Sequence, residues 1–119
     1  MQTRTLGRTG LEVSIMGMGG IPLMRCSPQE GEALYRYALD QGINYFDAAR
    51  GYVECHARLG PAIKGRRDQV IIGSKDGART AEKMMAAIDD SLEVLEGLLQ
   101  DALHRVADHR RAVERWYYD

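Results

Sequence analysis

The chain has 119 residues, which is enough for one domain with a modest hydrophobic core. Sixteen lysines and arginines against seventeen aspartates and glutamates give a formal net charge of -1, which argues against nucleic acid or an acidic membrane surface as a partner. Two cysteines are too few for a disulfide framework, and no apolar run resembles a signal peptide or a membrane span. We therefore expect a soluble, cytoplasmic protein.

The first elements of the chain are short and separated by glycines. The sequence predicts a hairpin with its turn at Gly7–Gly10, followed by one buried strand at Val13–Met18. The stretch SPQE then predicts the start of a helix. Ser27 can cap that helix, Pro28 suits its first position, and Glu30 can complete a capping box.

Two more strand and helix pairs follow along the chain. Ile43–Phe46 and Gln69–Lys75 are apolar runs that predict strands ending in polar residues. Between them, residues 56–65 predict a helix, in which Pro61 is unfavourable unless it falls in the first turn. Thr80 can cap a third helix. The expected core face of this helix consists of Met84, Ile88, Leu92 and Leu95.

This alternation of strands and helices predicts an α/β fold built from parallel βα units. In such folds the functional residues collect at the carboxyl ends of the strands. Asp47 and Tyr52 follow one such end, and Lys75 terminates the next. After Gly97 the pattern changes, and Leu98–Trp116 predicts a long amphipathic helix with no strand pattern.

An acid, a tyrosine and a lysine at neighbouring strand ends suggest a proton donor. A phenol of ordinary acidity protonates a carbonyl oxygen slowly, so Tyr52 would need a cationic neighbour. Lys75 could stabilise the phenolate, and Asp47 could hold the ammonium group in place. The alternative is that Asp47 caps a turn, Tyr52 packs, and Lys75 is solvated.

Several longer segments carry a resemblance to a known family. The stretches RTLGRTGLEVS, ALDQGINYFDAARGY and AIKGRRDQVIIGSKDGART together resemble the N-terminal part of the aldo/keto reductase family, over roughly Thr3–Leu95. The resemblance implies the start of a (βα)8 barrel opened by a hairpin, which uses NADPH to reduce aldehydes and ketones. We accordingly expect an aldo/keto reductase-like partial barrel at residues 1–96 and a divergent helical tail at residues 97–119.

The resemblance also implies roles for individual residues. Asp47, Tyr52 and Lys75 correspond to three members of the catalytic tetrad of Asp, Tyr, Lys and His. His104 is the candidate for the fourth, although LLQDALHRV departs from a family pattern resembling LLQLHRV, and a histidine on a helix is more often a surface or interface residue. Gly19 and Gly20 are expected beside the nicotinamide.

Residues Glu54–His56 depart from the family pattern as well. VECHARLG stands where members of the family commonly have a segment resembling GDSEERLG. This difference leaves the role of Glu54–His56 open. The adjacent cysteine and histidine have no partner motif, so we expect no metal site there.

Two functions remain open at this point. The first is an NADPH-dependent reductase of a small carbonyl substrate, or a piece of one. The second is a non-catalytic half-barrel that serves as an interaction module, because a complete barrel needs about 250 residues. A partial barrel has unpaired strand edges, which we expect the tail to cover or a homo-oligomer to pair.

Overall fold

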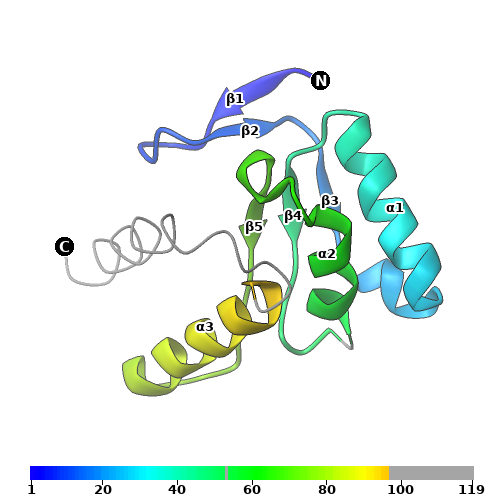
Figure 1. Cartoon of the computed structure of the whole chain (residues 1–119). Coiled ribbons are helices and arrows are strands. Elements are labelled where there is room, and N and C mark those ends of the chain that lie inside the picture. The colour runs from blue at the N-terminus through cyan, green and yellow to red at the C-terminus, as the bar shows by residue number, and fades with distance from the viewer. Residues whose placement is uncertain (53, 97–119) are drawn as a thin grey trace.

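The computed structural model describes residues 1–52 and 54–96, shown in Figure 1. Two antiparallel strands, β1 (Thr3–Thr5) and β2 (Glu12–Ser14), form a hairpin. Three parallel strands form a separate sheet in the order β3 (Gly17–Gly19), β4 (Tyr45–Asp47) and β5 (Ile71–Gly73). The helices are η1 (Ile21–Arg25), α1 (Pro28–Asp40), α2 (Cys55–Ile63), η2 (Arg67–Gln69) and α3 (Ala81–Glu96).

Each strand of the parallel sheet leads into a helix, which confirms the predicted α/β fold. The hairpin followed by three βα units is the arrangement expected for the beginning of a (βα)8 barrel. Figure 1 shows the hairpin across the end of the sheet where the strands begin, with the loops that follow the strands at the opposite end. The predicted tail at residues 97–119, including the helix at Leu98–Trp116, lies outside the described residues.

The core lies between the sheet and its helices. Phe46 of β4 is fully buried, and its ring meets that of Tyr35 from α1 edge to face, with centroids 5.6 Å apart. Leu59 and Ile63 of α2 are buried in the same cluster. Burial of each such side chain contributes about 1.5–3 kcal/mol. Helix α2 packs against both α1 and α3, so it is the central element of the helical layer.

Helix α1 begins as the sequence predicts. The hydroxyl of Ser27 accepts a hydrogen bond from the backbone N–H of Glu30 at 3.3 Å, and the carboxylate of Glu30 accepts one from the backbone N–H of Ser27 at 2.9 Å. Pro28 occupies the first helical position, where its missing N–H has no intrahelical partner to lose. The capping box is therefore formed completely.

The prediction of a single strand from Val13 to Met18 was wrong. The segment divides into β2 and β3, and between them Ile15 and Met16 are exposed. Asn44 explains the division, because its side chain accepts a hydrogen bond from the N–H of Ser14 and donates one to the carbonyl of Glu12. The hairpin is thus attached to the start of β4, and the chain must turn before it enters the parallel sheet.

The helix predicted at residues 56–65 is α2 (Cys55–Ile63), but Pro61 does not fall in its first turn. Pro61 lies in the last turn of α2 rather than the first, and the helix ends at Ile63, two residues later. A proline in this place removes one backbone hydrogen bond to the preceding turn, and its ring crowds the carbonyl oxygen four residues earlier. The strand predicted at Gln69–Lys75 is shorter than expected, because η2 occupies its first residue and β5 spans Ile71–Gly73.

Helix α3 begins after Thr80, whose hydroxyl accepts a hydrogen bond from the N–H of Lys83 at 3.3 Å. Its most buried stripe consists of Ala87, Ser91 and Leu95, and the predicted core residues Met84, Ile88 and Leu92 are half-buried beside this stripe. The hydroxyl of Ser91 donates to the carbonyl of Ala87, so the small polar side chain is satisfied inside the core. The helix is therefore rotated slightly from the expected orientation.

We predict that Ser27→Ala lowers the free energy of unfolding by about 1 kcal/mol, because α1 loses its side-chain cap. Urea denaturation followed by circular dichroism would measure the change. Ser27→Asp is the matched control, since aspartate caps a helix as well as serine. Equal unfolding midpoints for wild type, Ser27→Ala and Ser27→Asp would contradict the prediction.

Candidate active site

The candidate site lies at the carboxyl ends of the three parallel strands. Gly19, Asp47 and Gly73 are paired across these strands, so they reach the end of the sheet side by side. Backbone hydrogen bonds continue past the strand ends, from Ala48 N to Gly73 O at 2.7 Å and from Arg50 N to Lys75 O at 3.2 Å. The loops that carry the polar side chains are therefore anchored to one another by their backbones.

Asp47 and Lys75 form the central ion pair of the site. The ammonium nitrogen of Lys75 is 2.9 Å from each carboxylate oxygen of Asp47 and 2.9 Å from the carbonyl oxygen of Ala48. The side chains of Lys75 and Asp47 are 50% and 43% exposed, so solvent or a ligand can reach them. The hydrogen bond with Asp47 is the main cause that raises the pKa of Lys75; desolvation opposes it, and Tyr52 and the charge of Asp47 add smaller increases. Lys75 is thus a cation at neutral pH.

The third predicted residue, Tyr52, lies beside this ion pair. The ammonium nitrogen of Lys75 is 4.8 Å from the centre of the Tyr52 ring, within the range of a cation–π contact. The ring is half-buried and packs against the hydrophobic core. The backbone of Tyr52 donates to Ala49 O and accepts from Cys55 N, which places the ring in a defined turn. The structure therefore brings Asp47, Tyr52 and Lys75 together.

The two glycines predicted to contact a cofactor differ in their surroundings. At Gly20 a Cβ would lie 2.5 Å from the sulfur of Cys55 and 3.0 Å from the hydroxyl of Tyr35, so packing alone requires glycine there. At Gly19 a Cβ would meet no atom within 4 Å. Gly19 is therefore the member of the pair that leaves open space beside Asp47. Contact of either residue with a cofactor stays a prediction, and the predicted fourth catalytic residue, His104, lies outside the described residues.

His56 is a site residue that the sequence analysis left without a role. Its side chain is buried on α2, and Nε2 is 3.3 Å from the hydroxyl of Ser74, the residue before Lys75. Burial is the main cause that lowers the pKa of His56, and the nearby positive charge of Arg50 lowers it further. The imidazole is thus held in its neutral form. Only the departure of VECHARLG from the family pattern pointed to this position, and the sequence could not place Ser74 beside it.

Arg50 is a second residue that sequence reasoning missed. It lies between Asp47 and Tyr52 in the chain and forms an ion pair with Asp90 of α3, at 3.0 Å. Both side chains are partly exposed, so this pair contributes little to stability. Its effect is to attach the loop after β4 to α3.

Metal sites and membrane-spanning helices are both absent from residues 1–52 and 54–96. No three histidine, cysteine, aspartate or glutamate side chains of this part of the chain lie together in a way that could hold a metal ion. No helix in the same residues is long and apolar enough to cross a bilayer.

A partial βα barrel with aspartate, tyrosine and lysine at its strand ends defines the class of protein. The aldo/keto reductase family pattern matches residues 15–106, which is most of the chain and includes His104. The chain belongs to the aldo/keto reductase family.

Curated relatives support the same assignment. L-Galactose dehydrogenase of Arabidopsis thaliana is 33% identical over 119 aligned residues, which cover 87% of this chain and 37% of that protein. Pyridoxal 4-dehydrogenase of Microbacterium luteolum is 37% identical over 82 residues, which cover 64% of this chain and 24% of that protein.

Solved structures share the fold as well as the sequence. A putative aldo-keto reductase from Pseudomonas aeruginosa superposes with a TM-score of 0.72 at 35% identity, over 79% of this chain and 41% of that one. The holo form of an aldo-keto reductase from Bacillus halodurans gives 0.71 at 29% identity, over 81% and 37%. The chain thus spans 24% to 41% of the length of these four relatives.

We predict that Asp47→Asn lowers the pKa of Lys75 toward that of an ordinary lysine, because the amide cannot neutralise the ammonium group. The titration can be followed by NMR with lysine labelled at the carbon next to Nζ, since the chain has three lysines. Because the folded state raises this pKa, the ion pair stabilises the fold below the pKa of an unfolded lysine, and its contribution disappears as pH rises through the folded value.

Asp40→Asn is the matched control for this experiment. It removes a carboxylate from an ion pair with Arg66, on another part of the surface. The Lys75 titration should be the same in Asp40→Asn as in wild type. An unchanged titration in Asp47→Asn as well would show that the ion pair does not control the charge of Lys75.

Proposed function

We propose that this chain provides the proton-transfer half of an NAD(P)H-dependent carbonyl reductase, with Tyr52 as the proton donor. The observation that carries the proposal is the position of the Lys75 ammonium group, which is bound to both oxygens of Asp47 and lies 4.8 Å from the centre of the Tyr52 ring. A positive charge next to a phenol stabilises the phenolate that remains after proton transfer. Membership of the aldo/keto reductase family supports the same reaction class.

The three residues have separate roles in this reaction. Tyr52 donates its hydroxyl proton to the carbonyl oxygen of the substrate as that oxygen gains negative charge. Lys75 remains protonated, because its pKa is raised, so it acts as a fixed cation rather than as the acid. Asp47 holds the ammonium group beside the ring. Solvent returns a proton to Tyr52 after the alcohol leaves.

The chain has room for the reactive part of the cofactor at one place. Space next to Gly19, in register with Asp47, would accept a flat nicotinamide ring beside the ion pair. When bound, NAD(P)H supplies the hydride that adds to the carbonyl carbon. No glycine-rich phosphate loop is evident in the described residues. The cofactor site proposed for this chain is therefore limited to the nicotinamide end. We propose NADPH rather than NADH because the chain resembles the aldo/keto reductase family.

The curated relatives suggest the substrate class. One is named as a dehydrogenase of pyridoxal, an aromatic aldehyde, and another as a dehydrogenase of the sugar L-galactose. A dehydrogenase oxidises the compound in its name, so these names support a small polar substrate and do not fix the direction of the reaction. We propose a small polar carbonyl compound as the substrate of reduction, with oxidation of the corresponding alcohol or hemiacetal as the reverse reaction.

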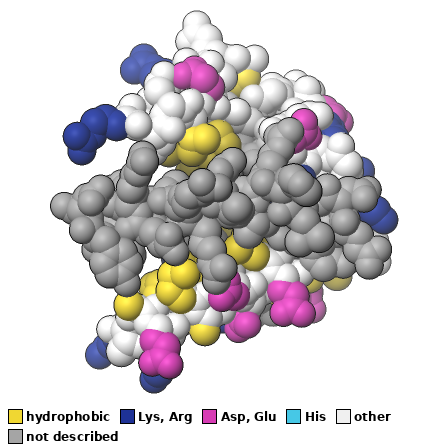
Figure 2. Space-filling model, turned by 60° about the vertical axis from the view of Figure 1, so that its left-hand side comes forward, with side chains coloured by type: hydrophobic (Ala, Val, Ile, Leu, Met, Phe, Trp, Pro, Cys, Tyr) yellow, Lys and Arg dark blue, Asp and Glu magenta, His cyan; other side chains and the backbone are white. Residues whose placement is uncertain are grey.

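A second candidate function is self-association without catalysis. Strands β3 and β5 are the two edges of the parallel sheet in the described chain, and each pairs only with β4 there. Several large hydrophobic side chains are exposed, among them Ile15, Met16, Ile21 and Tyr37. Figure 2 also shows hydrophobic side chains on one face of the molecule. Such edges and side chains favour pairing with a second copy of the chain.

We predict that Tyr52→Phe lowers kcat for carbonyl reduction by roughly 10²- to 10⁴-fold, because the general acid is lost while the ring and its packing remain. KM for NADPH should change little, since the hydroxyl is not needed to hold the cofactor. Steady-state kinetics with pyridoxal and with a sugar aldehyde would measure both constants. Tyr37→Phe is the control, because that tyrosine is exposed on α1, away from the strand ends.

A fluorescence titration with NADPH separates the two candidate functions. Saturable binding by wild type and by Tyr52→Phe is expected if the chain carries a cofactor site. A folded chain that shows self-association in light scattering and no binding at millimolar NADPH would favour the second candidate and refute catalysis by the chain alone.

A further inference from the structure

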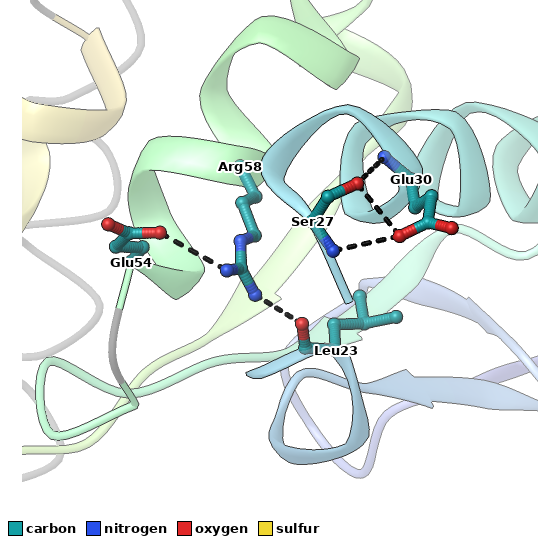
Figure 3. Close-up of polar contacts among 5 residues, drawn as sticks. All are labelled: Leu23, Ser27, Glu30, Glu54 and Arg58. Atoms are coloured by element: carbon teal, nitrogen blue, oxygen red, sulfur yellow. Dashed lines mark hydrogen bonds and ion pairs between the residues drawn. The ribbon is translucent and has the colours of Figure 1, made fainter. Parts of the chain in front are cut away.

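Arg58 is a buried cation that the proposed reaction does not use. Its side chain is 7% exposed and crosses α1 at Gly31, where a Cβ would lie 2.9 Å from its Cδ. Its Nη1 donates to the carbonyl oxygen of Leu23, and its Nη2 donates to the carboxylate of Glu54 at 3.1 Å (Figure 3). Its Nε is buried without a hydrogen-bond partner in the described residues.

Burial of a guanidinium in the core is unfavourable in free energy compared with burial of an apolar side chain. Burial of a cation removes its hydration, and the cost is recovered only when its hydrogen bonds are complete. Arg58 leaves one donor unsatisfied, whereas an apolar side chain of similar length would fill the same space without that cost. Stability alone therefore does not explain Arg58, and its role is better inferred from the two groups that it binds.

The first of these groups belongs to a strained turn. Glu54 has a φ of 57°, and no other residue except glycine has a positive φ in the described chain. This conformation is unfavourable for a residue with a Cβ. Glu54 also forms no side-chain cap for α2. Its carboxylate instead binds the Arg58 guanidinium, and its carbonyl oxygen accepts the Arg58 backbone N–H at 2.9 Å. The backbone bond is the first one of α2 and would form with any residue at position 58, so the guanidinium–carboxylate contact is what Arg58 itself adds to hold Glu54 in the left-handed conformation.

The turn that Arg58 holds is the one that positions Tyr52. Glu54 lies two residues after Tyr52, and the next residue, Cys55, donates its N–H to the carbonyl oxygen of Tyr52 at 3.0 Å. A change in the backbone at Glu54 would therefore move the start of α2 relative to Tyr52. Because the Tyr52 ring contacts the Lys75 ammonium group, the same change would separate the proton donor from its cation.

The second group that Arg58 binds belongs to the opposite side of the site. Leu23 lies in η1, which begins directly after Gly19 and Gly20, and its N–H donates to the carbonyl oxygen of Gly20 at 3.2 Å. Two residues after η1 ends, Ser27 forms the capping box of α1 with Glu30, as Figure 3 shows. One guanidinium therefore joins the segment after β3 to the turn after β4.

We propose that Arg58 is a positioning residue, which holds the left-handed turn at Glu54 and thereby keeps Tyr52 against Lys75 and at a constant distance from the Gly19–Gly20 segment. The proposal rests on the proposed function for its consequence in catalysis. The positioning itself is a property of the fold, and it can be measured in a chain that shows no activity.

The test compares Glu54→Ala with Glu54→Gly in the full chain. Both variants remove the carboxylate that binds Arg58, but glycine adopts a positive φ without strain and alanine does not. The readout is the NMR chemical shift of the labelled Lys75 carbon next to Nζ and of its protons. The ring current of Tyr52 changes these chemical shifts. Lys75→Arg identifies the signal among the three lysines.

Glu54→Gly is expected to keep the ring-current change in the Lys75 chemical shift, and Glu54→Ala is expected to lose it. The chemical shifts of Lys64 and Lys83 should be unchanged in both variants. Arg58→Met should also lose the ring-current change, and the double variant Arg58→Met with Glu54→Gly should recover it. Ser27→Ala is the stability control, since it weakens α1 without touching Glu54, and its Lys75 signal should stay at the wild-type position.

Equal behaviour of Glu54→Ala and Glu54→Gly, in either direction, would overturn the proposal. This comparison decides even if Arg58→Met does not fold, because Glu54 is more than half exposed and tolerates substitution. Where wild type reduces a carbonyl substrate, Glu54→Ala should lower kcat by up to about a hundredfold with little change in KM, since it misplaces a reacting group. A wild-type chain without activity would refute the proposed function, while the NMR comparison would still test the role of Arg58.

Discussion

The central strand β4 controls both the core and the candidate site. Its three residues alternate between the two faces of the sheet, so Phe46 points into the helical layer and Asp47 points to the other face at the strand end. Phe46 is fully buried, and a shift of one residue in register would bring Asp47 into the core instead. Burial of one phenylalanine ring therefore sets the position of the carboxylate that binds Lys75.

The site is assembled from backbone geometry as much as from side chains. Hydrogen bonds beyond the strand ends connect Gly20 to Asp47, Ala48 to Gly73, and Arg50 to Lys75. These contacts fix the loops after all three strands relative to one another. The ammonium group of Lys75 is therefore held close to the carboxylate of a different strand. The same set of loops includes the strained residue Glu54, whose conformation is compatible with the fold because Arg58 binds it from a neighbouring turn of α2.

Two glycines allow close packing around the site. Gly20 and Gly31 have no side chain at points where Cys55, Tyr35 and Arg58 approach closely. These glycines allow α1 and α2 to approach the end of β3, and this close packing gives the buried guanidinium its two acceptors. An aldo/keto reductase chain that spans 24% to 41% of its relatives thus retains a dense arrangement around the turn that carries its tyrosine.

The sequence alone was enough to predict the class of fold, the hairpin turn, the capping box of α1 and the grouping of Asp47, Tyr52 and Lys75 at the strand ends. These features depend on local rules, since capping, glycine turns and apolar periodicity act over a few residues, and the motifs are contiguous. Three features became visible only in the folded chain: the division of Val13–Met18 into two strands, the pairing of His56 with Ser74, and the contacts of Arg58 with Leu23 and Glu54. Each of these depends on partners that are 18 to 35 residues apart or on a backbone conformation that no residue type requires. A single sequence contains no local signal for such contacts, because they arise only when α1, α2 and the strand ends pack together.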